Sequence, residues 1–147
     1  MPFERAFSNL GAKVGDLESA WRDRLIDAEH LMNADRYSTA ISMGLYALEI
    51  LLKSRICLRL DLRQLPKPFE IHDLSGLLVL SGHSRSINKK IARRVKTNWV
   101  QVEKMSRELL KLRYQPNTMK TRQMAEDFFA QLKAEPDGVI PWISSQS

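Results

Sequence analysis

The stretch from Tyr37 to Lys53 constrains the fold more than any other part of the chain. Residues recur there at steps of three and four and therefore fall on one helical face. The six residues of this face are Tyr37, Ala40, Gly44, Ala47, Leu48 and Leu51. Three of them are small, which allows a second helix backbone to approach closely. The pattern predicts a tightly packed helical bundle.

A chain of 147 residues with 44% hydrophobic and 27% charged residues is expected to form one globular, soluble domain. No apolar run reaches the ~18–20 residues that cross a bilayer, and the first residues do not resemble a signal peptide. Cys57 is the only cysteine, so an internal disulfide is excluded. We therefore expect a cytoplasmic protein with Cys57 in its core and no membrane association.

Residues with helical spacing also lie on both sides of this stretch. A first helix is expected to begin at Asp16 as its N-cap and to carry an apolar face. The second helix is expected to run from about Arg36 to Arg59. The alternating residues 58–63 that follow are consistent with a frayed helix end or a short strand. The frayed end is favoured because the sequence offers no evident partner strand.

The C-terminal half continues the helical pattern. His72 or Asp73 is expected to cap a short third helix, and Thr118 is expected to cap the last one. Between them lies an apolar stripe with a step of four, formed by Ile87, Ile91 and Val95. A longer pattern then runs from Trp99 to Leu112, either as one kinked helix with the stripe or as a separate helix. The inner side of the last helix is expected to hold Met124, Phe128, Phe129 and Leu132.

Together these patterns predict an all-α fold, a compact up-and-down bundle of about five helices. The expected divisions are an N-terminal extension over residues 1–15, the bundle over 16–134, and a C-terminal tail over 135–147. The tail is expected to dock because residues 139–143 are too apolar to remain free. Surplus apolar surface on this tail and around Leu48–Leu52 predicts a homodimer.

Positive charge is concentrated in one interval. The net charge is +6, and no acidic residue lies between Asp73 and Glu103. That interval holds six basic residues, called here the basic segment: Arg85, Lys89, Lys90, Arg93, Arg94 and Lys96. A phosphate backbone is the partner that such a segment favours, and a solvated face is the alternative. Aromatic residues are missing from it until Trp99, so base stacking is not indicated.

Three landmarks occur in order along the chain. The first is the pattern Tyr37, Ala40, Ala47, Glu49 and Lys53. The second is Ile71-His72-Asp73-Leu74 after a proline-containing loop. The third is Leu112-Arg113-Tyr114 followed by Pro116. Together they resemble the HEPN domain, a helical bundle named for nucleotide binding in higher eukaryotes and prokaryotes. The resemblance implies one of two functions. Many members are metal-independent ribonucleases with an arginine and a histidine four to six residues apart. Others are nucleotide- or RNA-associated modules, often dimeric and often beside a nucleotidyltransferase.

The chain departs from the nuclease pattern of that family. No histidine follows His83, so Arg113 lacks its expected partner. The one correctly spaced pair, Arg24 and His30, lies in the first helix about 120° apart in azimuth. The resemblance therefore implies a non-catalytic nucleotide- or RNA-binding module, in a toxin–antitoxin or defence system, with an antitoxin or nucleotidyltransferase partner. A divergent ribonuclease and a structural adaptor for protein interaction remain the alternatives.

Five residues at the family landmarks are ligand-binding candidates, and each has a structural alternative. Glu49 and Lys53 line a polar pocket or form an exposed pair one turn apart. His72 contacts a ligand, caps a helix or packs with its ring hydrogen-bonded. Arg113, beside Tyr114, contacts a ligand or complements a helix C-terminus. The sequence contains neither a metal-ligand cluster nor a glycine-rich phosphate loop, so no metal or cofactor is predicted.

Overall fold

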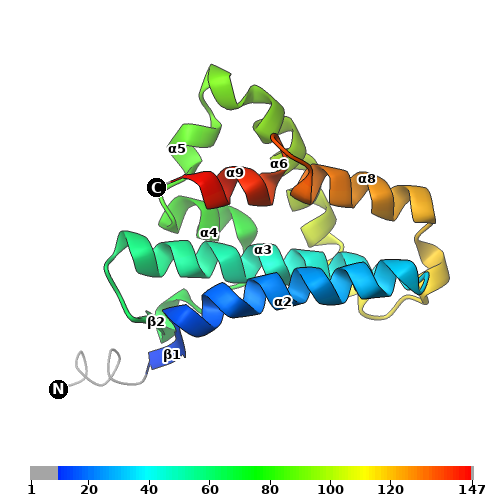
Figure 1. Cartoon of the computed structure of the whole chain (residues 1–147), viewed down its shortest axis with the longest axis horizontal. Helices are drawn as coiled ribbons and strands as arrows, with labels where there is room; N and C mark the ends of the chain where they lie inside the picture. Colours follow the sequence, from blue (N-terminus) through cyan, green and yellow to red (C-terminus); the bar gives the residue numbers. More distant parts are fainter. Residues whose placement is uncertain (1–9, 147) are drawn as a thin grey trace.

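The computed structural model describes residues 10–146 and is mostly helical, as predicted (Figure 1). Two long helices, α2 (Val14–Asn33) and α3 (Tyr37–Arg59), form an antiparallel hairpin along one side of the molecule. The turn between them is tight, and Asp35 adopts the left-handed conformation there with φ 59°. An aspartate tolerates this conformation better than most residues, which explains its place in the turn.

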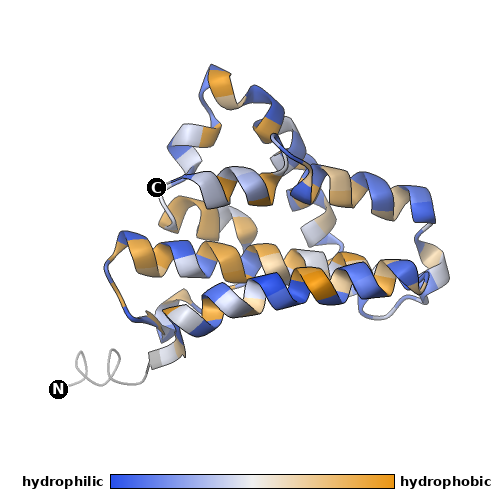
Figure 2. Ribbon diagram, in the orientation of Figure 1, coloured by the Kyte–Doolittle hydropathy of each residue, from blue (hydrophilic) through white to orange (hydrophobic). Residues whose placement is uncertain are grey.

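Helix α3 is more apolar than its hairpin partner α2 (Figure 2). Its small-residue face is buried, with Ala40 and Ala47 fully inaccessible to solvent. A Cβ built on Gly44 would lie 2.9 Å from the ring of Phe129 and 3.0 Å from Leu132. Both neighbours belong to α8 (Arg122–Lys133), so a second helix does approach this face closely, as predicted.

Further helices cover α3 on the side away from α2 (Figure 1). They are α4 (Leu74–Leu80) and α9 (Val139–Ser145), and α6 (Arg93–Arg107) packs in turn against α4, α8 and α9. Helix α9 packs against α3, α6 and α8 and buries Val139, Ile140 and Ile143. Leu48, Leu51 and Leu52 of α3 are also fully buried. The apolar residues that suggested a homodimer therefore lie largely inside the chain.

A two-stranded antiparallel ribbon closes the end of the α2–α3 hairpin. Strand β1 (Leu10–Lys13) pairs with β2 (Gln64–Pro66), and Lys13 lies opposite Gln64. Residues 58–63 contain no strand, as preferred, because α3 ends at Arg59, a turn follows, and β2 begins only at Gln64. The missing partner strand is β1, within the expected N-terminal extension, of which residues 1–9 lie outside the described part. Leu65 of β2 packs with Cys57, which is buried as expected.

Two predicted helix caps were wrong, and one was right. Helix α2 begins at Val14, so Asp16 lies in its first turn instead of capping it. The cap of α8 is Thr121, whose hydroxyl accepts a hydrogen bond from the Met124 N–H at 3.1 Å. Thr118 lies instead in a short 3-10 turn, η3 (Asn117–Met119). Asp73 does cap α4, since its carboxylate accepts from the Gly76 N–H at 3.2 Å.

The chain between α4 and α6 is irregular. It contains one helical turn, α5 (Ser84–Ile87), and a 3-10 turn, η2 (Lys90–Ala92). Because helical spacing is interrupted there, Ile87 and Val95 are buried whereas Ile91 is 95% exposed. The expected stripe of three was thus wrong at its middle position. The longer pattern is also divided, since α6 is followed by a separate turn, α7 (Leu109–Leu112).

Candidate functional site

The structure brings three of the predicted ligand residues together. Glu49 and Lys53 lie one turn apart on α3, and Lys53 Nζ is 3.4 Å from Glu49 Oε2. The two side chains are only 13% and 10% exposed, so this is not the surface pair that one reading of the sequence allowed. His72, in the loop before α4, places Nδ1 at 2.9 Å from Glu49 Oε1. The histidine therefore makes a ring hydrogen bond from an exposed position, while Asp73 caps the helix.

This Glu49 cluster holds α3 to the loop that precedes α4. Both carboxylate oxygens of Glu49 already have a partner, Lys53 on one side and His72 on the other. The His72 ring remains largely exposed, so it is the part of the cluster that an external molecule can reach. A mostly buried carboxylate needs such partners because burying it alone is costly.

Arg113 and Tyr114 lie away from the Glu49 cluster. Both are exposed and follow α7, where Arg113 is the C-cap residue. Shortly after them, Asn117 Oδ1 accepts hydrogen bonds of 3.1 Å from the backbone and the hydroxyl of Thr39. Thr39 precedes Glu49 by ten residues on α3, which is about 15 Å of helix. The structure thus divides the predicted ligand residues between two regions.

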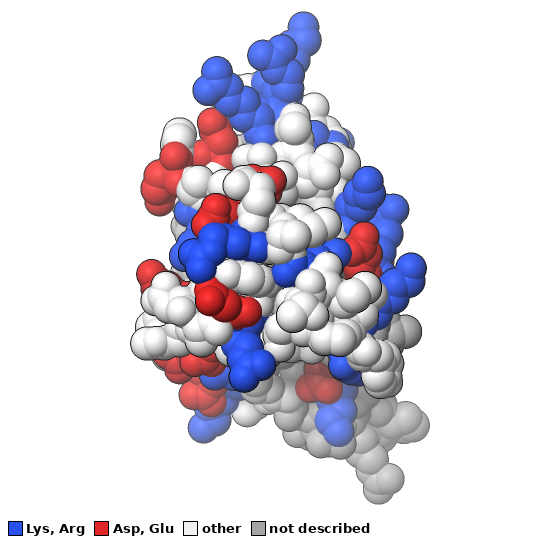
Figure 3. All heavy atoms as spheres, turned by 90° about the vertical axis from the view of Figure 1, so that its right-hand side faces the viewer, with Lys and Arg blue, Asp and Glu red and all other residues white. Residues whose placement is uncertain are grey.

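The basic segment runs from α5 through η2 into the first turn of α6, at the tip of the molecule (Figure 1). All of its basic residues are exposed except Lys96, which is half-buried. The upper end of the molecule carries Lys and Arg side chains with no acidic ones among them (Figure 3). Arg94 lies 3.8 Å from Asp137, and this is the ion pair seen for the segment within residues 10–146. Exposed Ile91 lies among these charges.

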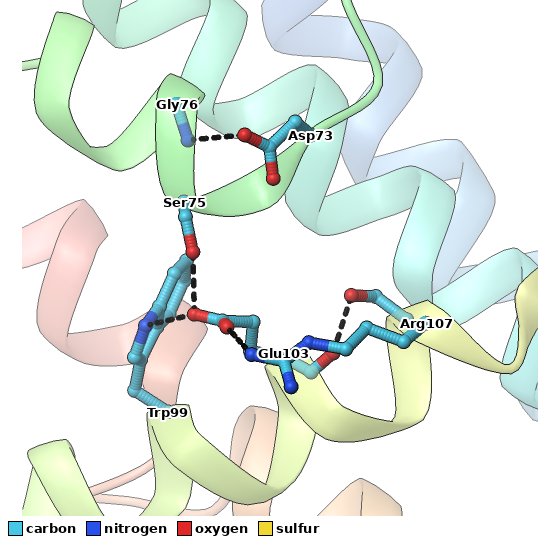
Figure 4. A network of polar contacts seen from close by, with 7 residues as sticks. Asp73, Ser75, Gly76, Trp99, Glu103 and Arg107 are labelled. Carbon is cyan, nitrogen blue, oxygen red and sulfur yellow. Dashed lines mark hydrogen bonds and ion pairs between the residues drawn. The ribbon is translucent and has the colours of Figure 1, made fainter.

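A network around Glu103, which the sequence analysis missed, joins α4 to α6 (Figure 4). Ser75 and the indole N–H of Trp99 donate to Glu103 Oε2 at 2.6 and 3.1 Å, and Arg107 donates to Oε1. Burial alone would raise the pKa of Glu103, but these donors and the Arg107 charge outweigh it and lower the pKa. The steps of four from residue 99 to 103 to 107 were a visible signal. The sequence gives no comparable signal for the partner on α4, Ser75.

Two arginines and a histidine that the sequence analysis did not select also lie together. They line a cavity of about 220 Å³ where the end of α3, the α4–α5 turn and the residue after α9 meet. The lining residues are Arg55, Leu58, Arg59, Ser81, His83 and Gln146. We call it the Arg–His cavity. The spacing of Arg55 and Arg59 places both on one side of α3, but only the fold adds His83.

The groups of the Arg–His cavity are fixed from several sides. Arg59 Nη1 donates to the Leu80 carbonyl at 2.9 Å and so caps the end of α4. Gly82, with φ +87°, leaves room for the Arg59 side chain, which a Cβ would approach to 3.1 Å. The His83 ring meets the Trp142 ring edge to face at 5.9 Å. Burial, followed by the charges of Arg55 and Arg59, lowers the pKa of His83.

Comparison of the chain with protein-family models, curated proteins and solved structures found no match. Within residues 10–146, no three His, Cys, Asp or Glu side chains are grouped so that they could hold a metal ion. The same residues include no helix with the length and apolar character needed to cross a membrane.

Proposed function

We propose that this protein is a non-catalytic, HEPN-like module that associates with RNA or nucleotides through the basic segment. One observation carries the proposal. The six basic residues run from α5 through η2 into the first turn of α6, on a projecting part of the chain, with no acidic residue among them in the sequence. Because these residues gather at one tip, a phosphate backbone can contact several of them at once.

The contacts of the segment favour recognition of backbone over recognition of bases. Lys89, Lys90 and Arg93 have no ion-pair partner within the described residues, and the pair between Arg94 and Asp137 is long and exposed. Such surface pairs contribute about 0–1 kcal/mol and are easily exchanged for a phosphate. Without aromatic side chains to stack on bases, binding is expected to be independent of sequence.

Binding of single-stranded RNA at increasing salt tests this proposal. If about six phosphates are contacted, affinity should fall several hundredfold between roughly 50 and 200 mM salt, because bound counterions are released. Replacing Arg93 and Arg94 together by glutamine should weaken binding and reduce the slope of log affinity against log salt by about 1.4. Fluorescence anisotropy with a labelled oligomer measures both quantities.

A matched control is the double substitution Arg63→Gln with Lys67→Gln. It removes the same charge from exposed residues near β2, far from the tip in Figure 1. This variant should bind RNA nearly as the unchanged protein does. Equal weakening by both variants would mean that only net charge matters. No RNA binding at the lowest salt would refute the proposal outright.

Two other functions are separated by direct assays. A divergent ribonuclease using Arg113, or Arg24 with His30, should cleave RNA in the presence of a chelator. In the structure Arg24 Nε lies 3.0 Å from Asp27, and His30 lies six residues further along a regular helix. That arrangement favours the non-catalytic function. A protein-interaction adaptor should instead bind neither RNA nor nucleotide.

The resemblance to HEPN domains supports two further proposals about partners. One is a homodimer, which sedimentation at micromolar concentration tests. The other is a role in a toxin–antitoxin or defence system, with an antitoxin or nucleotidyltransferase as the partner. The genes that flank this one would show whether such a partner is encoded beside it.

A further inference from the structure

The Arg–His cavity shares no lining residue with the basic segment or with the Glu49 cluster. Its volume of about 220 Å³ far exceeds the ~10–15 Å³ that one water needs. No acidic side chain is among its lining residues, and two of them are arginines. The cavity is therefore large enough for a small ligand and carries positive charge.

Two nitrogen atoms of this cavity's residues lack partners. Arg55 Nε and His83 Nε2 are buried and have no hydrogen-bond partner within the described residues. Buried polar groups are nearly always paired, so unpaired nitrogens on residues that line a cavity indicate a missing partner. Arg55 is a donor, and His83 can donate or accept according to its tautomer. An oxyanion accepts from both when the imidazole carries a proton on Nε2.

The charges around the cavity leave a positive surplus. Arg55 also faces Glu18 of α2, and its charge helps to lower the pKa of that carboxyl group, whose burial acts in the opposite direction. Arg59 has no acidic partner within the described residues, and its contacts to Val79 and Leu80 are to backbone carbonyls. At least the positive charge of Arg59 therefore remains uncompensated. A doubly charged anion would balance this charge and the charge of a protonated His83.

We propose that the Arg–His cavity binds a phosphate group, with Arg59 as its main charged contact and Arg55 and His83 as hydrogen-bond partners. The phosphate is either the terminal phosphate of a nucleotide or nucleic-acid chain, or an internal phosphodiester of such a chain. Arg59 is already positioned by α4 and His83 by Trp142, so little side-chain ordering is needed on binding. This site is independent of RNA binding by the tip.

Sulfate is the probe for the first test, because its charge stays constant between pH 5 and 8. The ring resonances of His30, His72 and His83 are followed by NMR in the full chain at increasing sulfate. We expect a saturable shift at His83 and a rise of its pKa, since the anion offsets the two arginine charges that lower this pKa in addition to burial. Sulfate should accordingly bind more tightly at pH 6 than at pH 8. A His83 pKa that sulfate leaves unchanged would overturn the proposal.

Arg59→Gln should weaken sulfate binding by about tenfold or more, because a charge-assisted contact is lost. Arg59→Lys keeps the charge without the planar fork and should give an intermediate value. Arg63→Gln is the matched control, and near-ultraviolet circular dichroism shows whether each variant stays folded. Sulfate affinity equal to that of the unchanged protein in folded Arg59→Gln would refute the assignment.

Competition against sulfate identifies the source of the phosphate. Adenosine monophosphate and an end-phosphorylated RNA oligomer should both compete, and the same oligomer with a terminal hydroxyl should compete only if internal phosphates enter. If none of the three competes, the phosphate assignment is wrong. The Arg93/Arg94 double variant should retain the His83 response to sulfate, so failure of the RNA proposal and failure of this one are distinguishable.

Discussion

At the scale of single residues, the fold relies on carboxylates that are held between helices. Glu49 joins α3 to the loop before α4, and Glu103 joins α6 to α4. Each is mostly buried and has donors on both oxygens. Such groups stabilise the fold while they are ionised and paired, and they become costly when a partner is removed. Both clusters join α3 or α6 to the region around α4.

Glu103→Gln should lower the free energy of unfolding at pH 7 by about 1–2 kcal/mol, because the charged contacts to Arg107 and Ser75 weaken. The lowered pKa of Glu103 means that its ionised form stabilises the fold above the unfolded pKa, about 4.3. That stabilisation is lost as the pH falls through the folded value. Urea unfolding at pH 7 and pH 3 should therefore show a difference that shrinks in acid.

The exposed Glu126 offers the control for this measurement. Glu126→Gln should change stability by no more than about 0.5 kcal/mol at either pH. A Glu103 variant as stable as the Glu126 variant would show that the network in Figure 4 contributes nothing net.

At the scale of elements, regular helices were predictable and irregular segments were not. The spacing of small and large apolar residues gave α3 its bounds almost to the residue, because local periodicity decides a long buried helix. The same rule failed at Ile91, where the chain leaves the helix and periodicity has no meaning. It also failed at β2, whose partner β1 lies some fifty residues earlier. In the Glu49 cluster, the spacing of Glu49 and Lys53 was visible in the sequence. The Arg–His cavity was not predictable, because it forms only where three separate elements meet.

The contact between α3 and α8 provides an element-scale test. Gly44→Ala should destabilise the protein by about 1–2 kcal/mol. The added methyl would lie within 3.1 Å of Phe128, Phe129 and Leu132, and this crowding should exceed the ~1 kcal/mol gained from helix propensity. Thermal and urea unfolding measure the difference.

Gly15→Ala is the matched control, since nothing lies within 4 Å of a Cβ at that position in α2. It should leave stability unchanged or raise it by up to about 1 kcal/mol. If both alanine variants were equally stable, the close approach of α8 to α3 would be contradicted.

At the scale of the whole molecule, the charged groups titrate in two separate ranges. The pKa of Glu18 and Glu103 is lowered by hydrogen bonds and arginine charges that outweigh burial. They affect stability only in acid. His83 affects it nearer neutrality, because burial and the charges of Arg55 and Arg59 lower its pKa. The molecule should therefore lose stability in two steps as the pH falls.

The first of these steps belongs to His83. Its folded pKa lies below the unfolded value of about 6.5, so the unfolded chain takes up the proton more readily. Stability should be full above that value and should decrease as the pH falls from about 6.5 toward the folded pKa. Urea unfolding at pH 7.5 and pH 5.5 should show the decrease, and His83→Gln should reduce it. An undiminished decrease in that variant, with His30→Gln as control, would contradict the assignment.

The docking of α9 has a consequence for how quickly the molecule folds and unfolds. The α2–α3 hairpin joins neighbouring segments, whereas α9 meets α3 across roughly ninety residues of chain, so closure by α9 should come late. Ile41→Val in α3 should then mainly slow folding, and Ile143→Val in α9 should mainly speed unfolding, at similar losses of stability. Stopped-flow rates against urea separate the two effects. The lifetime of the folded state would thus be governed by the last helix to arrive.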